Sequence, residues 1–368
     1  MRILVTGAGG FIGKNLVVSL EERVDTEVLS FGRDDGVEAL ATLVAKADAV
    51  VHLAGENRPV DVADFALVNT NLTSTLCDAI RDAGRNIPLI LASSTQAEQD
   101  NPYGKSKRAA EEVVEDFVNK TGNCAVIYRL PGVFGKWCKP NYNSVVATFC
   151  HNIARDLPIQ INDATAAVQL VYIDDVVDGL LQTLDETPSG LVWGQVDTTY
   201  TISLGDLSVQ IRSFQNCRTN LILGRVGTGL TRALYSTYIS YLPPEKFTYD
   251  LPTHGDERGT FVEMLKTPDC GQFSFFTVHP GVMRGSHYHH TKTEKFLVLS
   301  GVARMCFRQM VTGETYEVMV SGDKPQVVDT IPGWVHDITN VGDCEVVVML
   351  WANELFDRKK PDCIPCEV

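Results

Sequence analysis

The chain has 368 residues, of which 44% are apolar, 21% charged and 8% aromatic. These values are typical of a folded globular protein and exclude a disordered or collagen-like chain, and the length predicts about two domains. With 32 basic and 46 acidic residues the net charge is -14, so we expect neither nucleic acid nor an anionic membrane as a partner. No apolar run approaches about 18 residues and no signal-peptide pattern opens the chain, which predicts a cytoplasmic protein.

The first half alternates short apolar runs with helical patterns, which is typical of a parallel sheet covered by helices on both faces. We expect central strands at 3–6, 27–31, 49–53, 88–93 and 125–130. We expect helices near 13–22, 37–47, 65–83, 103–120, 144–155 and 204–213. The fold class predicted for this half is therefore an α/β Rossmann domain.

The pattern changes after Pro243-Pro244, which is the candidate domain boundary. Beyond it, short strands at 272–278, 295–299, 303–307, 316–320 and 345–351 alternate with Gly, Pro and Asp turns. This predicts a small all-β barrel or sandwich. The expected domains are thus 1–245 and 246–368.

Ten cysteines are scattered along the chain without the spacing of a disulfide framework. Most are expected to be buried small residues in a reducing compartment. Cys363 and Cys366 form a Cys-x-x-Cys pair near the end of the chain. Because no second pair is present, we interpret this motif as a coincidental tail.

A glycine-rich turn, GAGGFIG at residues 7–13, joins the first strand to the first helix. Gly7 permits a tight turn, Gly10 lets backbone amides approach a pyrophosphate, and Gly13 lets helix and strand pack closely. In this strand-turn-helix context the motif predicts dinucleotide binding. Arg33, after the second strand, favours the 2'-phosphate of NADPH, although Asp34 and Asp35 beside it leave NADH open.

Tyr103 and Lys107 form a Y-x-x-x-K pair on one face of a predicted helix. An ammonium beside a phenol lowers the pKa of the phenol, so Tyr103 is a candidate acid/base. The strand before this helix ends in Ser93-Ser94-Thr95, and one of these hydroxyls is expected to bind the reacting oxygen. All three remain open.

Six of the eight histidines lie in the second half. His287 and His289 project to one face of a predicted strand, Glu294 begins the next, and His336 arrives from a distant strand. Such a ligand set suits zinc, iron, manganese or nickel, and zinc is the working expectation. His290 faces the opposite side from His289 and is left out of the set.

Further segments of the first half resemble the extended short-chain dehydrogenase/reductases: DAVVHLAG (48–55), NLTST (71–75), RLPGVFG (129–135) and VYIDDV (171–176). The resemblance implies Tyr103 as acid/base, Lys107 as its partner that also holds the ribose, and Ser94 as the hydroxyl partner. The cofactor-binding residues it implies are Gly7, Gly10, Phe11, Ile12, Gly13, Arg33, Leu53, Ala54, Gly55, Asn71, Tyr103, Lys107, Pro131 and Val133.

The histidine motif of the second half resembles the cupin barrel. Residues 256–263 and 280–287 are further similar to cupin epimerases that act on nucleotide sugars beside a 4-keto group. Those epimerases commonly work without metal, so the role of a metal here, catalytic or structural, stays open.

The two halves together resemble bifunctional nucleotide-sugar enzymes of bacterial capsule and O-antigen synthesis. The resemblance implies that the cupin epimerises C3 of UDP-2-acetamido-2,6-dideoxy-4-hexulose. It implies that the reductase then converts the C4 ketone to UDP-2-acetamido-2,6-dideoxy-L-talose with NADPH, in the UDP-L-FucNAc pathway. A homodimer is also expected.

Four polar residues are candidates for binding the sugar or its diphosphate: Lys139, Asn141, Asn143 and Arg284. For the first three, a role in stabilising their loop is equally compatible with the sequence.

Two other functions remain open for the whole protein. One is a lone 4-ketosugar reductase with a structural or sugar-binding cupin, and the other is a non-catalytic NADP-sensing regulator.

Overall fold

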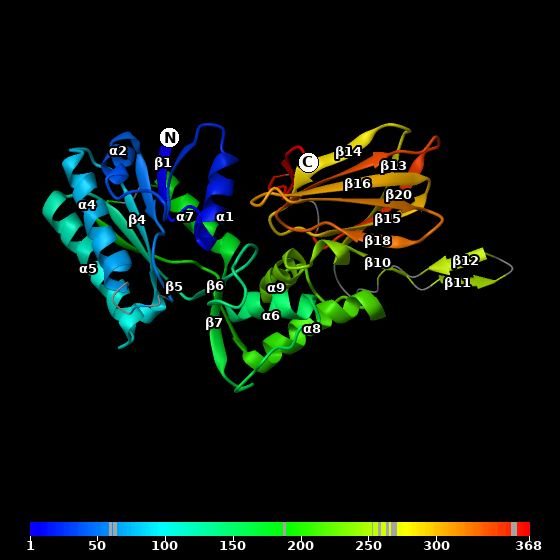
Figure 1. Cartoon of the computed structure of the whole chain (residues 1–368), viewed down its shortest axis with the longest axis horizontal. Coiled ribbons are helices and arrows are strands. Elements are labelled where there is room, and N and C mark those ends of the chain that lie inside the picture. The colour runs from blue at the N-terminus through cyan, green and yellow to red at the C-terminus, as the bar shows by residue number, and fades with distance from the viewer. Residues whose placement is uncertain are drawn as a thin grey trace. The chain divides into compact units, whose positions relative to one another are not determined.

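The computed structural model describes residues 1–58, 61, 65–186, 189–251, 253–256, 259–262, 265, 271–354 and 359–368 (Figure 1). These residues form two compact units. The first comprises Met1–Lys139 and Val168–Thr201, and the second comprises Pro140–Ala167 and Ile202–Val368. Within the described ranges, no helix combines the length and apolar character needed to cross a bilayer.

A six-stranded parallel sheet forms the centre of the first unit, with the order β2-β1-β3-β4-β5-β8. Its strands are β1 (Arg2–Thr6), β2 (Glu27–Phe31), β3 (Ala49–His52), β4 (Leu89–Ser94), β5 (Ala125–Leu130) and β8 (Leu191–Gly194). The five strands predicted from continuous apolar runs are confirmed. Strand order reverses at β1, which lies between β2 and β3, and ligands of such sheets bind at this point.

Helices cover both faces of this sheet, as predicted. On one face α2 (Ala39–Lys46), α4 (Leu72–Asp82) and α5 (Pro102–Thr121) pack on a continuous apolar core with the strands (Figure 1). On the other face, α1 (Phe11–Glu21) packs against α7 (Ile173–Glu186). A π-helical segment, η1 (Ala66–Asn71), precedes α4, and a 3-10 turn, η2 (Thr95–Glu98), precedes α5.

The start of α5 determines where the predicted catalytic pair lies. Asn101 caps the helix, because its Oδ1 accepts the Gly104 N–H at 2.8 Å, and Pro102 occupies the first helical turn. The helix ends at Gly122, which has φ of 71°. Tyr103 therefore lies in the first turn of α5, beside the end of β4.

Three helices belong to the second unit: α6 (Val145–Ala154), α8 (Leu204–Asn220) and α9 (Gly229–Ser240). The first was predicted, and α8 is longer than the predicted 204–213. α9 was not predicted, although Tyr235, Tyr238 and Ile239 bury its inner face. Its run of Ser, Thr and Tyr carries little helical signal.

Two antiparallel five-stranded sheets make up the rest of this unit, with the orders β10-β18-β15-β20-β13 and β17-β16-β19-β14-β21. The strands are β10 (Thr248–Asp250), β13 (Gln272–Val278), β14 (Met283–Tyr288), β15 (Glu294–Ser300), β16 (Val302–Gln309), β17 (Thr315–Ser321), β18 (Gln326–Asp329), β19 (Trp334–Asn340), β20 (Val346–Ala352) and β21 (Ile364–Pro365). The predicted all-β character is confirmed.

The remaining elements are short: β6 (Gly132–Phe134), β7 (Ala167–Tyr172), β9 (Tyr200–Ser203), η3 (Pro244–Lys246) and the hairpin β11 (Thr253–Asp256) and β12 (Gly259–Val262). The hairpin falls within the epimerase-like motif 256–263. Glu257, Arg258 and Glu263 of that motif lie outside the described residues.

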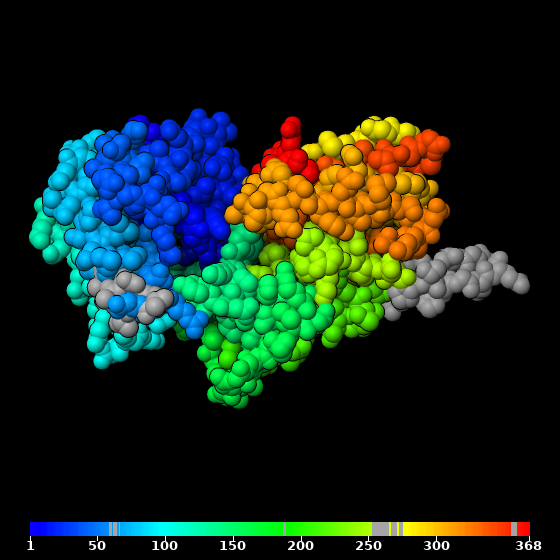
Figure 2. All heavy atoms as spheres, in the orientation of Figure 1, coloured from blue at the N-terminus to red at the C-terminus, as the bar shows by residue number. Residues whose placement is uncertain are grey.

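The helices of the second unit pack against its strands, as the green and orange spheres of Figure 2 show. A buried ion network makes this connection: Arg218 of α8 pairs with Asp329 of β18, and Lys295 of β15 binds the same carboxylate at 2.6 Å. Phe247, fully buried just after η3, packs its ring against Trp334. The division into domains 1–245 and 246–368 remains a prediction.

Candidate functional site

The glycine turn after β1 is shaped by two close approaches of backbone. Gly7 has φ of +70°, and a Cβ there would lie 2.7 Å from the Ala54 nitrogen. A Cβ on Gly13 would lie 2.2 Å from the Gly7 carbonyl oxygen. Neither position tolerates a side chain, which gives the physical reason for both glycines.

The first turn of α1 presents its backbone N–H groups without a side-chain cap. Gly10 is the N-cap residue and makes no side-chain cap hydrogen bond, and a Cβ on Gly9 would meet no atom within 4 Å. Phe11 and Ile12, both half-buried, begin the helix. This uncapped helix N-terminus beside open space fits the pyrophosphate of a dinucleotide.

The loop after β3 completes this edge of the sheet. Leu53 and Ala54 donate their N–H groups to the Thr6 carbonyl and hydroxyl, at 3.1 and 3.2 Å. His52, fully buried, hydrogen-bonds with Thr6 Oγ1 at 2.6 Å and Thr73 Oγ1 at 2.9 Å. Burial and nearby Lys107 lower the pKa of His52 to about 3. The His52 side chain is therefore uncharged, and its two hydrogen bonds connect β3 to β1 and α4.

Arg33 follows β2 as predicted, with its side chain 88% exposed. Its guanidinium lies 3.1 Å from Glu56, an acidic residue that the sequence analysis did not single out. Asp35, the competing candidate for a ribose hydroxyl, accepts the Gly32 N–H at 2.7 Å and so closes the turn after β2.

Ser94, Tyr103 and Lys107 come together at the carboxyl end of β4. Of the three hydroxyl candidates, Ser94 is the one whose side chain lies near enough to Tyr103 to lower the pKa of its phenol. Ser93 instead donates to Glu111 of α5, and Thr95 is exposed. The ammonium of Lys107 is buried and donates to the Ala92 carbonyl at 2.9 Å.

The acid/base properties of this group differ from the expectation. Burial raises the pKa of Tyr103, and the hydrogen bond from Ser94 lowers it only in part. Burial also lowers the pKa of Lys107 to about 8, against the opposing effect of Glu111. In this structure Tyr103 is therefore a protonated phenol at neutral pH, which suits proton donation.

Asn69 links the cofactor side of the site to the catalytic helix. Its Oδ1 accepts the Glu56 N–H at 2.8 Å, and its Nδ2 donates to the Glu56 carbonyl and to Ser106 Oγ, both at 2.9 Å. A Cβ on Gly55 would lie 3.0 Å from Asn69 Oδ1 and 3.3 Å from Lys107 Nζ. The loop after β3 thus lies directly against Lys107.

The motif at 71–75 pointed to Asn71 rather than Asn69 as the cofactor-binding residue of this region. Asn71 is exposed at the end of η1, whereas Asn69 is 2% exposed. The π-helical turn of η1 changes the face on which each residue lies, and helical periodicity does not predict such a turn. Asn69 lies four residues before Thr73, and the Thr73 hydroxyl donates to the Asn69 carbonyl. This spacing is the sequence signal that could have identified Asn69.

Replacing Asn69 by Ala should raise the Kd for the dinucleotide and lower stability by about 1–3 kcal/mol, because buried hydrogen-bonding groups lose their partners. Asn71→Ala is the matched comparison and should change neither quantity by more than about 0.5 kcal/mol. Fluorescence titration and thermal unfolding measure both effects. A larger effect from Asn71→Ala would return the assignment to that residue.

The loop after β6 contains the predicted sugar-binding residues of the first half. Lys139 and Asn143 are exposed. Asn141, at φ of 53°, donates its backbone N–H to Thr148 Oγ1 at 3.0 Å. Asn141 Nδ2 also lies 3.4 Å from Asn152 Oδ1. These contacts give Asn141 a role in its loop, and sugar binding by the three residues remains a prediction.

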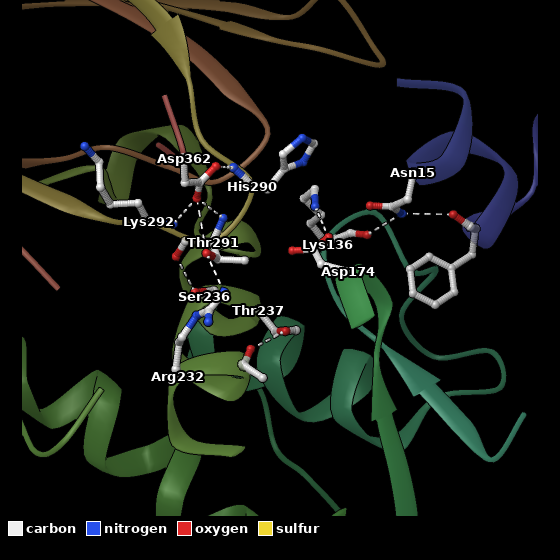
Figure 3. Close-up of polar contacts among 12 residues, drawn as sticks. Asn15, Lys136, Asp174, Arg232, Ser236, Thr237, His290, Thr291, Lys292 and Asp362 are labelled. Carbon is white, nitrogen blue, oxygen red and sulfur yellow. Dashed lines mark hydrogen bonds and ion pairs between the residues drawn. The ribbon is translucent and has the colours of Figure 1, made fainter. Parts of the chain in front are cut away.

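Lys136, in the same loop, was missed. It is 1% exposed, and its ammonium lies 2.6 Å from Asp174 at the start of α7 (Figure 3). Asn15 of α1 donates to the Lys136 carbonyl at 3.3 Å. The loop beyond β6, with half-buried Pro131 and Val133 at its base, is thereby tied to the cofactor helix.

His287, His289, Glu294 and His336 converge in the second unit, and their candidate ligand atoms all lie within 4.8 Å of one another. His287 of β14 lies opposite His336 of β19 in the strand register. Glu294 Oε2 lies 3.2 Å from His289 Nε2 and 3.7 Å from His336 Nε2. The four residues that the sequence selected are thus brought together from β14, the loop directly after it, β15 and β19.

The electrostatics of this cluster fit a divalent cation. His336 is buried, and neither of its ring nitrogens has a hydrogen-bond partner among the described residues. Burial and the neighbouring imidazoles lower the pKa of His287 to about 4. Although burial opposes it, His289 and His336 hold the pKa of Glu294 well below its ordinary value. Neutral imidazoles and an ionised carboxylate are the forms that bind metal.

Two other polar residues near this motif are placed differently. Arg284 is exposed, lies over the Phe276 ring at 5.1 Å and donates to the Thr277 carbonyl at 3.1 Å, so its sugar contact remains a prediction. Lys292, which the sequence analysis passed over, is buried and lies 2.8 Å from Glu294 Oε1. His290 is outside the cluster, as predicted.

Comparison with known proteins adds to this geometry. Residues 3–194 match the NAD dependent epimerase/dehydratase family, and residues 254–364 match the polysaccharide biosynthesis C-terminal domain. The chain is 56% identical over its whole length to a UDP-2-acetamido-2,6-beta-L-arabino-hexul-4-ose reductase from Pseudomonas aeruginosa, and the match covers 99% of that protein.

The solved structures include a full-length relative. The capsular polysaccharide assembling protein CapF from Staphylococcus aureus is 42% identical, with a TM-score of 0.69 and complete coverage of both chains. Over 122 residues, 30% of this chain and 81% of the relative, the chain is 23% identical to the spore coat polysaccharide biosynthesis protein SpsL of Bacillus subtilis. The chain therefore belongs to the NAD-dependent epimerase/dehydratase family and, over its full length, to the family that includes CapF.

Proposed function

We propose that the chain is a nucleotide-sugar 4-ketoreductase that reduces a UDP-2-acetamido-2,6-dideoxy-4-hexulose with NADPH in a capsule or O-antigen pathway. The observation that carries this proposal is the convergence of Ser94, Tyr103 and buried Lys107 next to the glycine turn. The name of the Pseudomonas aeruginosa relative, a reductase of such a UDP-hexulose, supports the substrate class.

The residues at the end of β4 can carry out the proton transfer of this reduction. Tyr103 is a protonated phenol within hydrogen-bond reach of Ser94, so both hydroxyls can bind one ketone oxygen. Tyr103 then donates its proton as negative charge develops on that oxygen, and the ammonium of Lys107 stabilises the phenolate that results. NADPH, when bound, supplies the hydride.

The second unit is proposed to epimerise C3 before the reduction. A C4 ketone acidifies the neighbouring C–H and stabilises an enolate, whereas the reduced alcohol has no such electron sink. His287, His289, Glu294 and His336 would hold a divalent cation, for which zinc is our first choice, and such a cation polarises a carbonyl oxygen. The product of both steps would be UDP-2-acetamido-2,6-dideoxy-L-talose.

A direct experiment tests both activities. The protein is incubated in deuterated water with a UDP-4-keto-6-deoxy-HexNAc, with and without NADPH, while absorbance at 340 nm and product NMR are recorded. We expect deuterium at C3 without NADPH, and a C4 alcohol with it. Reduction at C4 without deuterium exchange at C3 would indicate that the protein is a 4-ketosugar reductase without epimerase activity. NADPH binding without any turnover would indicate a non-catalytic NADP-sensing regulator.

Arg33 should determine the preference for NADPH. Because its guanidinium is exposed and Asp35 is engaged by Gly32, Arg33→Ala should raise KM for NADPH about tenfold and leave KM for NADH unchanged, in line with the loss of a charge-assisted hydrogen bond. Steady-state kinetics with both cofactors measure this. An equal change for NADPH and NADH would show that Arg33 does not contact the 2'-phosphate.

The pH dependence should reflect Lys107. Its pKa of about 8 implies that the ammonium is lost above pH 8, so kcat/KM for reduction should fall about tenfold per pH unit there. The pH dependence of the unfolding free energy has the opposite sign. Between about 8 and the ordinary value of 10.5 the unfolded chain binds more protons, so the unfolding free energy rises with pH. A flat kcat/KM profile to pH 10 would contradict this assignment.

A further inference from the structure

The last residues of the chain form part of the second unit rather than a free tail. β21 pairs antiparallel with β14, with His287 opposite Pro365 and Tyr288 opposite Ile364. The Cys366 N–H donates to the Ser286 carbonyl at 2.8 Å. The segment interpreted from sequence as a coincidental tail is therefore the edge strand beside a residue of the metal-like cluster.

Asp362, just before β21, binds the loop that follows His289. Its Oδ1 accepts the His290 N–H at 2.7 Å. Its Oδ2 accepts the N–H groups of Thr291 at 2.7 Å and Lys292 at 2.6 Å, and the Thr291 hydroxyl at 3.1 Å (Figure 3). Three successive backbone donors thus converge on one carboxylate, an arrangement that holds a loop in one conformation.

The backbone of Asp362 contacts a cluster residue directly. The Asp362 carbonyl oxygen hydrogen-bonds His289 Nδ1. A carbonyl only accepts, so Nδ1 carries the proton and the lone pair of Nε2 is free to bind a cation. His289 Nε2 is the atom that lies 3.2 Å from Glu294 Oε2. Outer contacts of this kind orient metal-binding histidines.

The same loop is also anchored from α9. Ser236 Oγ donates to the Thr291 carbonyl at 2.7 Å, and Arg232 donates to Thr291 Oγ1 at 2.8 Å (Figure 3). Loss of the Asp362 side chain therefore removes one of two anchors. We expect variants at this position to fold.

We propose that Asp362 is a positioning residue for the cluster: through its carboxylate and its carbonyl it fixes the ring of His289 and the loop 290–292 for binding a divalent cation. This inference rests on the proposed metal site. The magnitude expected from such outer contacts is a 10–100-fold loss of metal affinity.

The test uses the full-length protein stripped of metal and titrated with Co²⁺, with Zn²⁺ competition to obtain affinities. Asp362→Ala and Asp362→Asn should each weaken binding about 10–100-fold and alter the visible Co²⁺ absorption at saturation. Asp343→Asn removes the same charge from an exposed turn of this unit and should change neither readout. Thermal unfolding of the metal-free proteins shows whether each variant is folded.

A double-mutant cycle separates positioning from a general loss of structure. In a His289→Ala background, Asp362→Ala should weaken Co²⁺ binding by less than about threefold, because the ring that it orients is gone. A full 10–100-fold effect in that background, or none in the wild-type background, overturns the inference while leaving the metal site intact. Absence of Co²⁺ binding to the wild-type protein would overturn the proposed site and this inference together.

Discussion

Replacing Tyr103 by Phe should lower kcat for ketone reduction by about 10²–10⁴-fold, the usual contribution of a positioned general acid. The substitution removes only the hydroxyl that Ser94 contacts and keeps the ring that packs 5.7 Å from Phe65. The Kd for NADPH should rise far less than kcat falls, because the main action of the lost hydroxyl is on the ketone oxygen. Single-turnover absorbance at 340 nm measures the chemical step.

Tyr316→Phe is the matched control for this experiment. Tyr316 lies in the second unit, where its ring packs on Phe247 and Phe307, so Phe retains those contacts. Its kcat should equal that of the wild type. If Tyr103→Phe retained more than about a tenth of the wild-type kcat, the acid would have to be another group.

Replacing His336 by Ala should abolish both metal binding and deuterium exchange at C3. His336 is buried, with neither ring nitrogen hydrogen-bonded in the described part of the chain, so its loss leaves three candidate ligands. A Lewis acid contributes several kcal/mol to an enolising step, which corresponds to an exchange rate about a thousandfold lower. NMR of the substrate in deuterated water, without NADPH, measures the rate.

His279→Ala provides the same substitution outside the cluster. His279 is exposed near Glu345 and should affect neither metal content nor exchange. If His336→Ala lost the metal but kept the wild-type exchange rate, the cation would be structural. If exchange failed in the wild type as well, the epimerase proposal would be wrong.

The two substitutions should also separate the two activities. Tyr103→Phe should retain exchange at C3, and His336→Ala should still reduce a ketone already epimerised at C3. Loss of both activities in either variant would contradict the assignment of one reaction to each site.

Much of the sheet of the first unit was predictable from short-range sequence patterns. Strands 27–31 and 125–130 coincide with β2 and β5. β5 is buried along almost its whole length, as expected for a central parallel strand with an apolar sequence. The glycine turn was predictable because Gly7 and Gly13 occupy positions where any Cβ would collide with backbone. The ligand set of His287 and His289 followed from the two-residue period of a strand.

The differences arose where local periodicity is interrupted. The π-helical turn η1 buries Asn69 and leaves Asn71 exposed, and cofactor binding by Asn71 remains a prediction. Ser93 and Ser94 were indistinguishable in sequence, and the packing of α5 determines that Ser94 lies beside Tyr103 while Ser93 donates to Glu111. Helix α9 was missed because its run of Ser, Thr and Tyr carries little helical signal and because its buried face depends on packing against α6 and α8.

Short-range sequence patterns were enough to predict the α/β and all-β halves, the glycine turn and the types of side chain available for chemistry. These depend on residue volume, backbone freedom and apolar period, which act over a few neighbours. Two other features depend on packing between distant segments: burial raises the pKa of Tyr103, and Asp362, near the end of the chain, contacts His289. Burial and long-range hydrogen bonds depend on which distant segments pack together, and no local pattern encodes that packing.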